Sequence, residues 1–162
     1  MLYIFWGLSC LVANYVAAKF ATIRAMSIQD HPLPDLLHDV FPKIPNHVPD
    51  YLLILCLSYI MILNLPINNV EIFRFLFSLS LRPIFICLTT FPTCYQEDNS
   101  PYSWSKHDLM FSGHTCCFLF FGRVIQGALG ISIQYVFPFT LIAARQHYTI
   151  DVIVAMLVYS NI

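Results

Sequence analysis

The sequence predicts an all-α, polytopic membrane protein, folded as a bundle of about six transmembrane helices. Of its 162 residues, 58% are hydrophobic and 10% are charged, whereas soluble domains carry about 25% charged residues. The apolar residues form runs of the length needed to cross a bilayer, which takes about 20 residues in a helix. Most polar residues gather between these runs.

Six apolar runs are predicted as spans within a single integral-membrane domain of residues 1–162. The last run has about 15 residues and would be about 22 Å long, so we expect it to tilt or to lie in a thinned bilayer. The spans are predicted at residues 2–22, 51–67, 75–92, 109–125, 127–143 and 148–162.

The first run has a second interpretation. Val16-Ala17-Ala18 resembles the cleavage site of a signal peptide. Because no basic residue precedes the run and the run is long enough to span, a retained first helix is favoured.

The polar residues concentrate in two long segments, residues 24–50 and 93–108. Five prolines prevent the first segment from forming a long helix. With six spans, the loops after the first, third and fifth spans lie on the same side of the membrane. Since the opposite side has only short turns, we expect the chemistry on the side of the long loops.

Charge and cysteine content exclude two classes of function. A net charge of −1 gives no long-range field for nucleic acid, so no nucleic-acid partner is expected. The six cysteines include no CxxC pair and no zinc spacing. Most of them fall in apolar runs, where cysteine behaves as a small hydrophobic residue.

The segment HYTID, residues 147–151, is the first candidate for chemistry. His147 and Asp151 are four residues apart at the start of the last span, so both side chains lie on one helix face. A carboxylate beside one imidazole nitrogen fixes the tautomer and makes the other nitrogen a better nucleophile. An ionisable pair at the edge of a span also favours a functional role.

The second candidate is DLMFSGHT, residues 108–115, at the start of the fourth span. Ser112 and Gly113 precede His114, and a helix start with glycine offers free N–H groups to a phosphate oxygen. His114 is then placed to act as a general acid on a leaving oxygen. Both candidate segments begin even-numbered spans, so we expect them at the same membrane face.

SGH followed by HxxxD resembles the type 2 phosphatidic acid phosphatase superfamily. Three further stretches resemble the sphingomyelin synthase family within it, which includes inositol phosphorylceramide synthase-like enzymes. The likeness runs in order from about residue 30 onward, with the same six-span layout. The stretches are DHPLPDLLHDVFPKI (30–44), LRPIFICLTTFPTC (81–94) and ARQHYTIDVIVA (144–155).

The resemblance implies a transferase of phosphorylated headgroups with a His/His/Asp catalytic triad. His147 would attack the phosphorus of a glycerophospholipid and form a phosphohistidine, while Asp151 would orient and activate it. His114 would protonate the departing diacylglycerol, then take the proton from the hydroxyl of a ceramide-like acceptor. No metal and no cofactor are implied.

Five further residues are candidates for holding the phosphate. The resemblance implies that Arg82 and Arg145 bind its oxygens, since a guanidinium presents a bidentate fork. Ser112 and Gly113 would supply the helix start, and Asp108 would orient the neighbouring groups.

Several points stay open. The family usually has Cys-Gly where this sequence has Lys106-His107, and the donor headgroup is choline, ethanolamine or inositol. Asp35, in the PLPD stretch, either contacts the headgroup or orients the loop.

Two alternative functions remain. A lipid phosphate phosphatase would use water as the acceptor. Phosphatases of the superfamily usually have a lysine where Phe75 stands and an arginine where Leu141 stands, but Arg82-Pro83 keeps part of their pattern. The other alternative is a non-catalytic, lipid-binding relative.

The expected partners are the lipid bilayer, a glycerophospholipid donor and a ceramide-like acceptor, with a homo-oligomer also compatible. The resemblance implies a multi-pass protein of the Golgi or plasma membrane, involved in sphingolipid metabolism. Its active site would face the lumen or the exterior.

Overall fold

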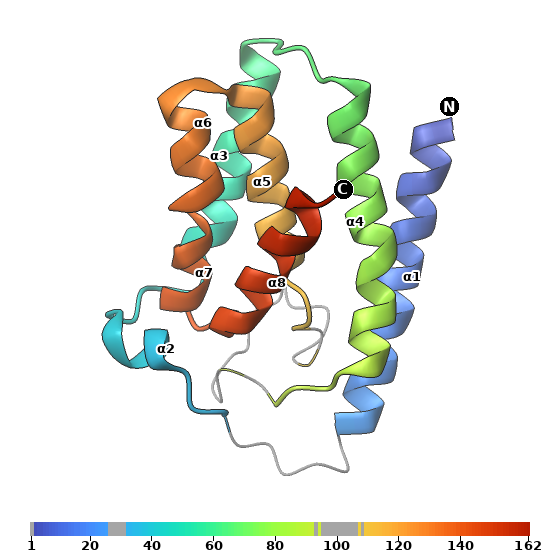
Figure 1. Ribbon diagram of the computed structural model, residues 1–162. Helices are drawn as coiled ribbons and strands as arrows, with labels where there is room; N and C mark the ends of the chain where they lie inside the picture. The colour runs from blue at the N-terminus through green and yellow to red at the C-terminus, as the bar shows by residue number, and fades with distance from the viewer. Residues whose placement is uncertain (1, 26–31, 93, 95–106, 108) are drawn as a thin grey trace.

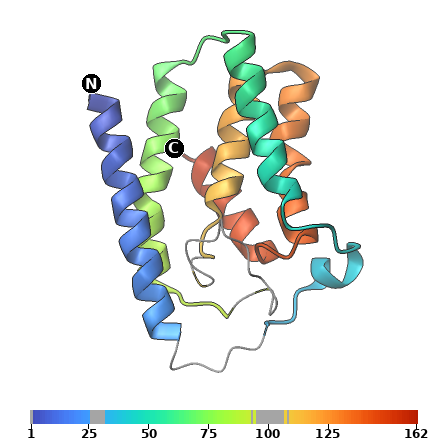
Figure 2. The same cartoon turned by 180° about the vertical axis from the view of Figure 1, so that it is seen from behind.

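The computed structural model describes residues 2–25, 32–92, 94, 107 and 109–162, which contain eight helices and no strand. The long helices run roughly alongside one another, as Figures 1 and 2 show from opposite sides. In chain order the helices are α1 (Leu2–Ala25), α2 (Leu36–Val40), α3 (Val48–Ile62), α4 (Asn69–Leu88), α5 (Gly113–Ile125), α6 (Gly127–Tyr135), α7 (Pro138–Ala143) and α8 (Thr149–Ser160).

Helix α5 is the centre of the bundle, because it contacts α3, α4, α6, α7 and α8. Its residues Phe118 and Leu119 are buried in two adjoining apolar clusters, which also take in Tyr159 of α8 and Leu141 of α7. Helix α1 packs against α4 on the outside of the bundle (Figure 1). The core therefore fixes α5 and α8 relative to each other.

The starts of α5 and α8 lie at the same end of the molecule, together with α2 and the end of α1 (Figure 1). The connections α3–α4 and α5–α6 are at the opposite end. This arrangement agrees with the prediction that the SGHT and HYTID segments share one end.

Membrane-spanning capacity, judged by length and apolar composition, is clear for α1 alone among the described helices. The helices α3, α5 and α8 and the stretch Gly127–Ala143 are apolar but have 10–17 residues. Helix α4 has 20 residues, three of them charged (Glu71, Arg74 and Arg82). The six-span bundle thus stays a prediction, while the all-helical class is confirmed.

Helix boundaries differ from the predicted spans where the chain supplies its own caps and breaks. The expected single helix over 127–143 is divided before Pro138, which lacks an N–H and begins α7. Helix α4 begins at Asn69, earlier than predicted, because the Asn68 side chain accepts a hydrogen bond from the Val70 N–H at 3.0 Å. Helix α5 begins at Gly113, later than predicted, since Ser112 caps it.

The hairpin of α5 and α6 depends on two glycines. A Cβ placed on Gly122 would lie 2.5 Å from the carbonyl oxygen of Gly130, closer than real Cβ contacts, and would also meet Gln134. The two helix backbones can therefore approach only because neither position has a side chain.

Replacing Gly122 by alanine is predicted to lower the free energy of unfolding by about 1–3 kcal/mol, because the added methyl group must push backbone away. Thermal unfolding in detergent measures the change. Gly7→Ala is the matched control, since its Cβ would meet only Leu76 at an ordinary 3.7 Å. Equal unfolding midpoints for the two variants would contradict the close packing of α5 on α6.

Candidate active site

His147 and Asp151 form a buried pair at the start of α8. The His147 Nδ1 lies 3.5 Å from the Asp151 Oδ2, and their side chains are 6% and 0% exposed. This distance is within the range of an ion pair, but the two atoms do not have the geometry of a hydrogen bond. In the described structure, neither His147 Nδ1 nor Asp151 Oδ1 has a hydrogen-bond partner. The Asp151 Oδ2 accepts the Tyr148 N–H at 3.0 Å, which closes the first turn of α8.

His114, the second residue of α5, is paired with Asp50 in the first turn of α3. Its Nε2 donates to the Asp50 Oδ1 at 3.1 Å, and the two side chains are 41% and 25% exposed. Sequence reasoning missed Asp50, because an acidic residue in a first helical turn is common. Its only sequence signal is its place at the end of the first polar segment.

The two pairs are brought together by a backbone link between their helices. The Ser112 N–H donates to the Asp151 carbonyl oxygen at 3.2 Å, while the Ser112 side chain accepts the Thr115 N–H at 3.1 Å and caps α5. The rings of His114 and His147 are consequently 6.2 Å apart between centroids. Two imidazoles, each beside its own carboxylate, therefore lie next to each other at this end of the bundle.

Arg82 of α4 also lies beside the start of α5. It is 8% exposed, and it donates from Nε to the Phe111 carbonyl at 2.7 Å and from Nη1 to Asn14 at 3.0 Å. A Cβ on Gly113 would lie 3.4 Å from the Arg82 Nε, so the guanidinium lies directly against the residue before His114. The structure thus places Arg82, Ser112, Gly113 and His114 together.

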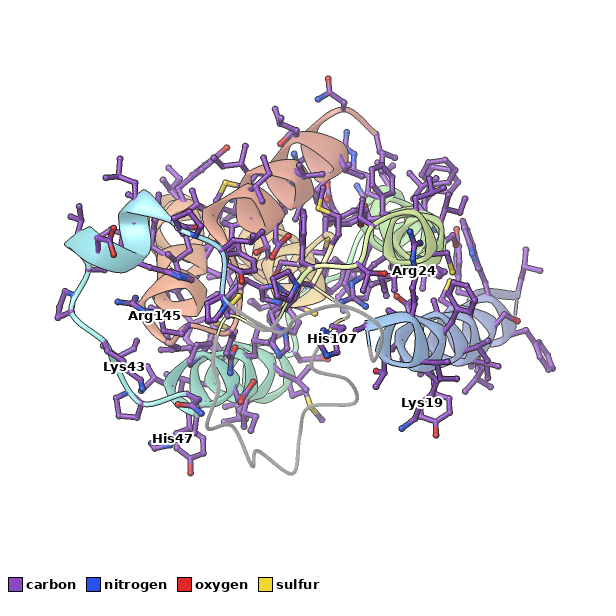
Figure 3. The ribbon with its side chains drawn as sticks, turned by 90° about the horizontal axis from the view of Figure 1, so that it is seen from below. Lys19, Arg24, Lys43, His47, His107 and Arg145 are labelled. Atoms are coloured by element: carbon purple, nitrogen blue, oxygen red, sulfur yellow. The ribbon has the colours of Figure 1, made fainter. Side chains whose placement is uncertain are left out.

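Arg145 has a different environment from Arg82. Its guanidinium donates to the carbonyls of Ile142, His38 and Phe41, and its backbone has a left-handed φ of 60°. These bonds connect the end of α7 to α2. Figure 3 shows Arg145 at this end of the molecule with Lys43, His47 and His107. Asp108, also predicted for the site, lies outside the described residues.

Asp35 of the first loop holds the start of α8. Its Oδ2 accepts the Thr149 N–H at 2.6 Å, and its Oδ1 accepts the Thr149 hydroxyl at 2.6 Å and the Leu37 N–H at 3.0 Å. Of the two roles left open by the sequence, orientation of the loop is the one these contacts support. Burial raises the pKa of Asp35, but the hydrogen bonds from Thr149 and Leu37 and the nearby His38 together outweigh it and hold the pKa below its ordinary value.

Tyr148 and His38, which sequence reasoning did not single out, tie the loops to this segment. The Tyr148 hydroxyl accepts the Leu33 N–H at 2.9 Å and donates to the Pro92 carbonyl at 3.2 Å. The His38 ring stacks on Tyr148, and its Nε2 donates to the His147 carbonyl at 3.0 Å. Cys94 of the second polar segment is also buried against Tyr148, so residues from both polar segments pack on residues 147–149.

Comparison with protein families adds to this geometry. Residues 107–162, which include α5 and α8, match the family model described as PAP2 superfamily C-terminal. The match supports the type 2 phosphatidic acid phosphatase superfamily. It covers well under half of the chain, and a search of curated proteins found no match.

Members of the PAP2 superfamily are generally phosphoryl-transfer enzymes and are typically associated with membranes. The matched region contains His114, His147 and Asp151, whereas Asn14, Asp35, Asp50 and Arg82 precede it. The superfamily therefore supports a lipid-related phosphatase or phosphotransferase function.

Asp35→Asn is predicted to lower the free energy of unfolding at neutral pH by about 1 kcal/mol, because a charged cap of two helices is lost. Since the folded pKa of Asp35 lies below its ordinary value of 3.8, the carboxylate stabilises the fold above that pH. This contribution is lost as the pH falls through the folded pKa.

Thermal unfolding of both proteins over a falling pH series checks this prediction. The gap between their midpoints should shrink below pH 3.8. Asp39→Asn, an exposed acid in the same helix α2, is the control. A gap that persists unchanged at low pH would show that the charge of Asp35 does not hold the loop.

Proposed function

We propose that the chain is an integral-membrane transferase that moves a phosphorylated headgroup from a glycerophospholipid to a ceramide-like acceptor. The observation that carries the proposal is the pairing of two histidines with two carboxylates at one end of an apolar bundle, their rings 6.2 Å apart. One imidazole serves as nucleophile and the other as general acid and base.

In the first half-reaction His147 attacks the phosphorus of the donor lipid. With Nδ1 directed at Asp151, the Nε2 of His147 is the nitrogen that forms the N–P bond. The bond from phosphorus to the glycerol oxygen breaks, and His114 gives its proton to the departing diacylglycerol. The buried His147–Asp151 contact at 3.5 Å is expected to tighten when substrate binds, because catalytic hydrogen bonds are often long in free enzymes.

In the second half-reaction the acceptor hydroxyl attacks the phosphohistidine. His114, now neutral, takes the hydroxyl proton, the N–P bond breaks and His147 is regenerated. Asp50 orients His114 through Nε2, which leaves Nδ1 of His114 for these proton transfers. The two carboxylates thus have parallel roles, one for each imidazole.

Arg82 and the start of α5 are proposed to hold the transferring phosphate. The guanidinium lies against Gly113, and the first N–H groups of α5 offer an anion site at a helix N-terminus. Asp108 is proposed to orient the neighbouring groups. Arg145 is proposed to act at the edge of the site, where its carbonyl contacts also hold α2.

A membrane location follows from the same proposal, because both lipid substrates reside in the bilayer. The apolar helices with large exposed side chains, such as Ile4 and Phe5 of α1 and Ile62 of α3, are proposed to face lipid as part of a six-span bundle. From the family resemblance, we propose that the protein lies in the Golgi or plasma membrane. Its site would face the lumen or the exterior.

The second candidate is a lipid phosphate phosphatase, in which water attacks the phosphohistidine. It is favoured by the match to the PAP2 superfamily and by the retained Arg82-Pro83 pair. The two candidates share the first half-reaction and differ only in the acceptor of the second.

A headgroup-transfer assay in proteoliposomes tests the proposal. Labelled ceramide is supplied with choline, ethanolamine and inositol phospholipids as separate donors, and His147→Ala is the control. A labelled phosphosphingolipid formed only by the wild-type protein is the expected result, and it identifies the donor. Release of phosphate or free phosphorylated headgroup, with ceramide unchanged, would contradict the transferase proposal and favour a hydrolase.

Asp50→Asn is predicted to reduce kcat about 10- to 100-fold with little change in KM, because His114 loses the carboxylate that orients it. Steady-state transfer rates give the two constants, and Asp39→Asn is the matched control outside the site. Unaltered kcat in Asp50→Asn would remove Asp50 from the proposed mechanism without affecting the role of His147.

A further inference from the structure

Pro83 leaves a carbonyl of α4 without its helical donor. In an α-helix the N–H of each residue bonds the carbonyl four residues before it, and proline has no N–H. The carbonyl of Leu79 is therefore unpaired within α4, at a point where the helix is covered by α1. A membrane helix tolerates such a proline when a neighbouring side chain supplies the missing donor.

Asn14 of α1 supplies that donor. It is buried, and its Nδ2 donates to the Leu79 carbonyl at 2.9 Å and to the Cys10 carbonyl of its own helix at 2.8 Å. Both protons of the amide group are thus used by backbone oxygens. Because the amide nitrogen is fixed in this way, the orientation of the amide oxygen is fixed as well.

The amide oxygen of Asn14 faces the site. It accepts a hydrogen bond from the Arg82 Nη1 at 3.0 Å, while the Arg82 Nε donates to the Phe111 carbonyl at 2.7 Å. The guanidinium is held between these two acceptors against Gly113, beside His114. A continuous set of contacts therefore runs from Pro83 through Asn14 and Arg82 to the start of α5.

The register of α1 on α4 keeps Asn14 opposite Leu79. The Trp6 Nε1 donates to the Ser80 hydroxyl at 2.8 Å, and the Cys10 thiol donates to the Leu76 carbonyl at 3.6 Å. Together with the contact of Asn14 to Leu79, these bonds form a row of polar contacts between α1 and α4. Towards the other end of the helix, the small residues Ala17 and Ala21 are buried against Ile86. Polar pairs and small residues are the contacts that fix helix pairs in a membrane.

We propose that Asn14 is a positioning residue for Arg82, and that α1 is thereby part of the structure of the active site as well as an apolar span. The inference rests on the proposed function, since it gives Arg82 the task of holding the transferring phosphate. The amide group is suited to the position because it is a donor to Leu79 and an acceptor for Arg82 at the same time.

Two double variants separate these uses of Asn14. Pro83→Ala gives α4 its own N–H for the Leu79 carbonyl, and the Cys10 carbonyl has its helical donor within α1, so neither oxygen then depends on the Asn14 amide. In that background, Asn14→Asp keeps an oxygen acceptor for Arg82, whereas Asn14→Leu removes it with similar side-chain volume. Asn14→Ala in the same background replaces the leucine variant if that variant does not fold.

The expected result is a difference in turnover without a difference in fold. Asn14→Asp/Pro83→Ala should transfer headgroup within about threefold of Pro83→Ala, whereas Asn14→Leu/Pro83→Ala should lose about 10- to 100-fold in kcat/KM. Inhibition by vanadate, a phosphate analogue, should weaken in the leucine variant alone. Both double variants should still unfold cooperatively, with a lower midpoint in the leucine variant because a buried guanidinium N–H loses its acceptor.

A readout independent of turnover keeps the two proposals distinguishable. The rate of Arg82 modification by phenylglyoxal, followed by peptide mass spectrometry, should rise in the leucine double variant and not in the aspartate one. An inactive wild-type protein would overturn the proposed function, and the modification rates would still test Asn14. Equal modification rates, or equal turnover in an active pair, would overturn the positioning role.

Discussion

The buried carboxylate of Asp151 is the interaction on which the rest of the site depends. Its Oδ2 closes the first turn of α8 and faces His147, while its backbone carbonyl accepts the Ser112 N–H at the start of α5. A fully buried carboxylate is costly unless protein groups replace its water. The backbone of Asp151 thus joins α8 to the start of α5, while its carboxylate closes α8 and faces His147.

The sequence was sufficient to predict the all-helical class. It also singled out His114, His147 and Asp151, which the structure brings close together. Spacing placed His147 and Asp151 on one face, and the order of apolar runs placed the SGHT and HYTID segments at one end. Asp50 and Asn14 could not be found in this way, because each acts through a partner more than 60 residues away in the chain. Arg145 could be recognised in the sequence as a cation near the site. The backbone carbonyls that its guanidinium bonds could not be predicted, because they come from folded loops.

Helix boundaries were the least predictable part of the fold, for a physical reason. Hydropathy follows the burial of side chains, whereas a helix ends where its backbone groups find other partners. Asn68 and Ser112 provide such partners, and Pro138 withholds one, so each moves a boundary inside or beyond an apolar run. Pro83 likewise lacks an N–H, and the buried amide of Asn14 in α1 bonds the Leu79 carbonyl that Pro83 leaves without a helical donor.

The contact between Asp35 and Thr149 joins positions 114 residues apart. During synthesis at about 5–20 residues per second, Asp35 in the first loop therefore waits roughly 6–23 seconds for Thr149 at the start of α8. Until α8 emerges, Asp35 of the first loop has no Thr149 against which to pack, and His114 has no second imidazole beside it. The candidate histidine pair can therefore form only after α1 to α7 have been synthesised.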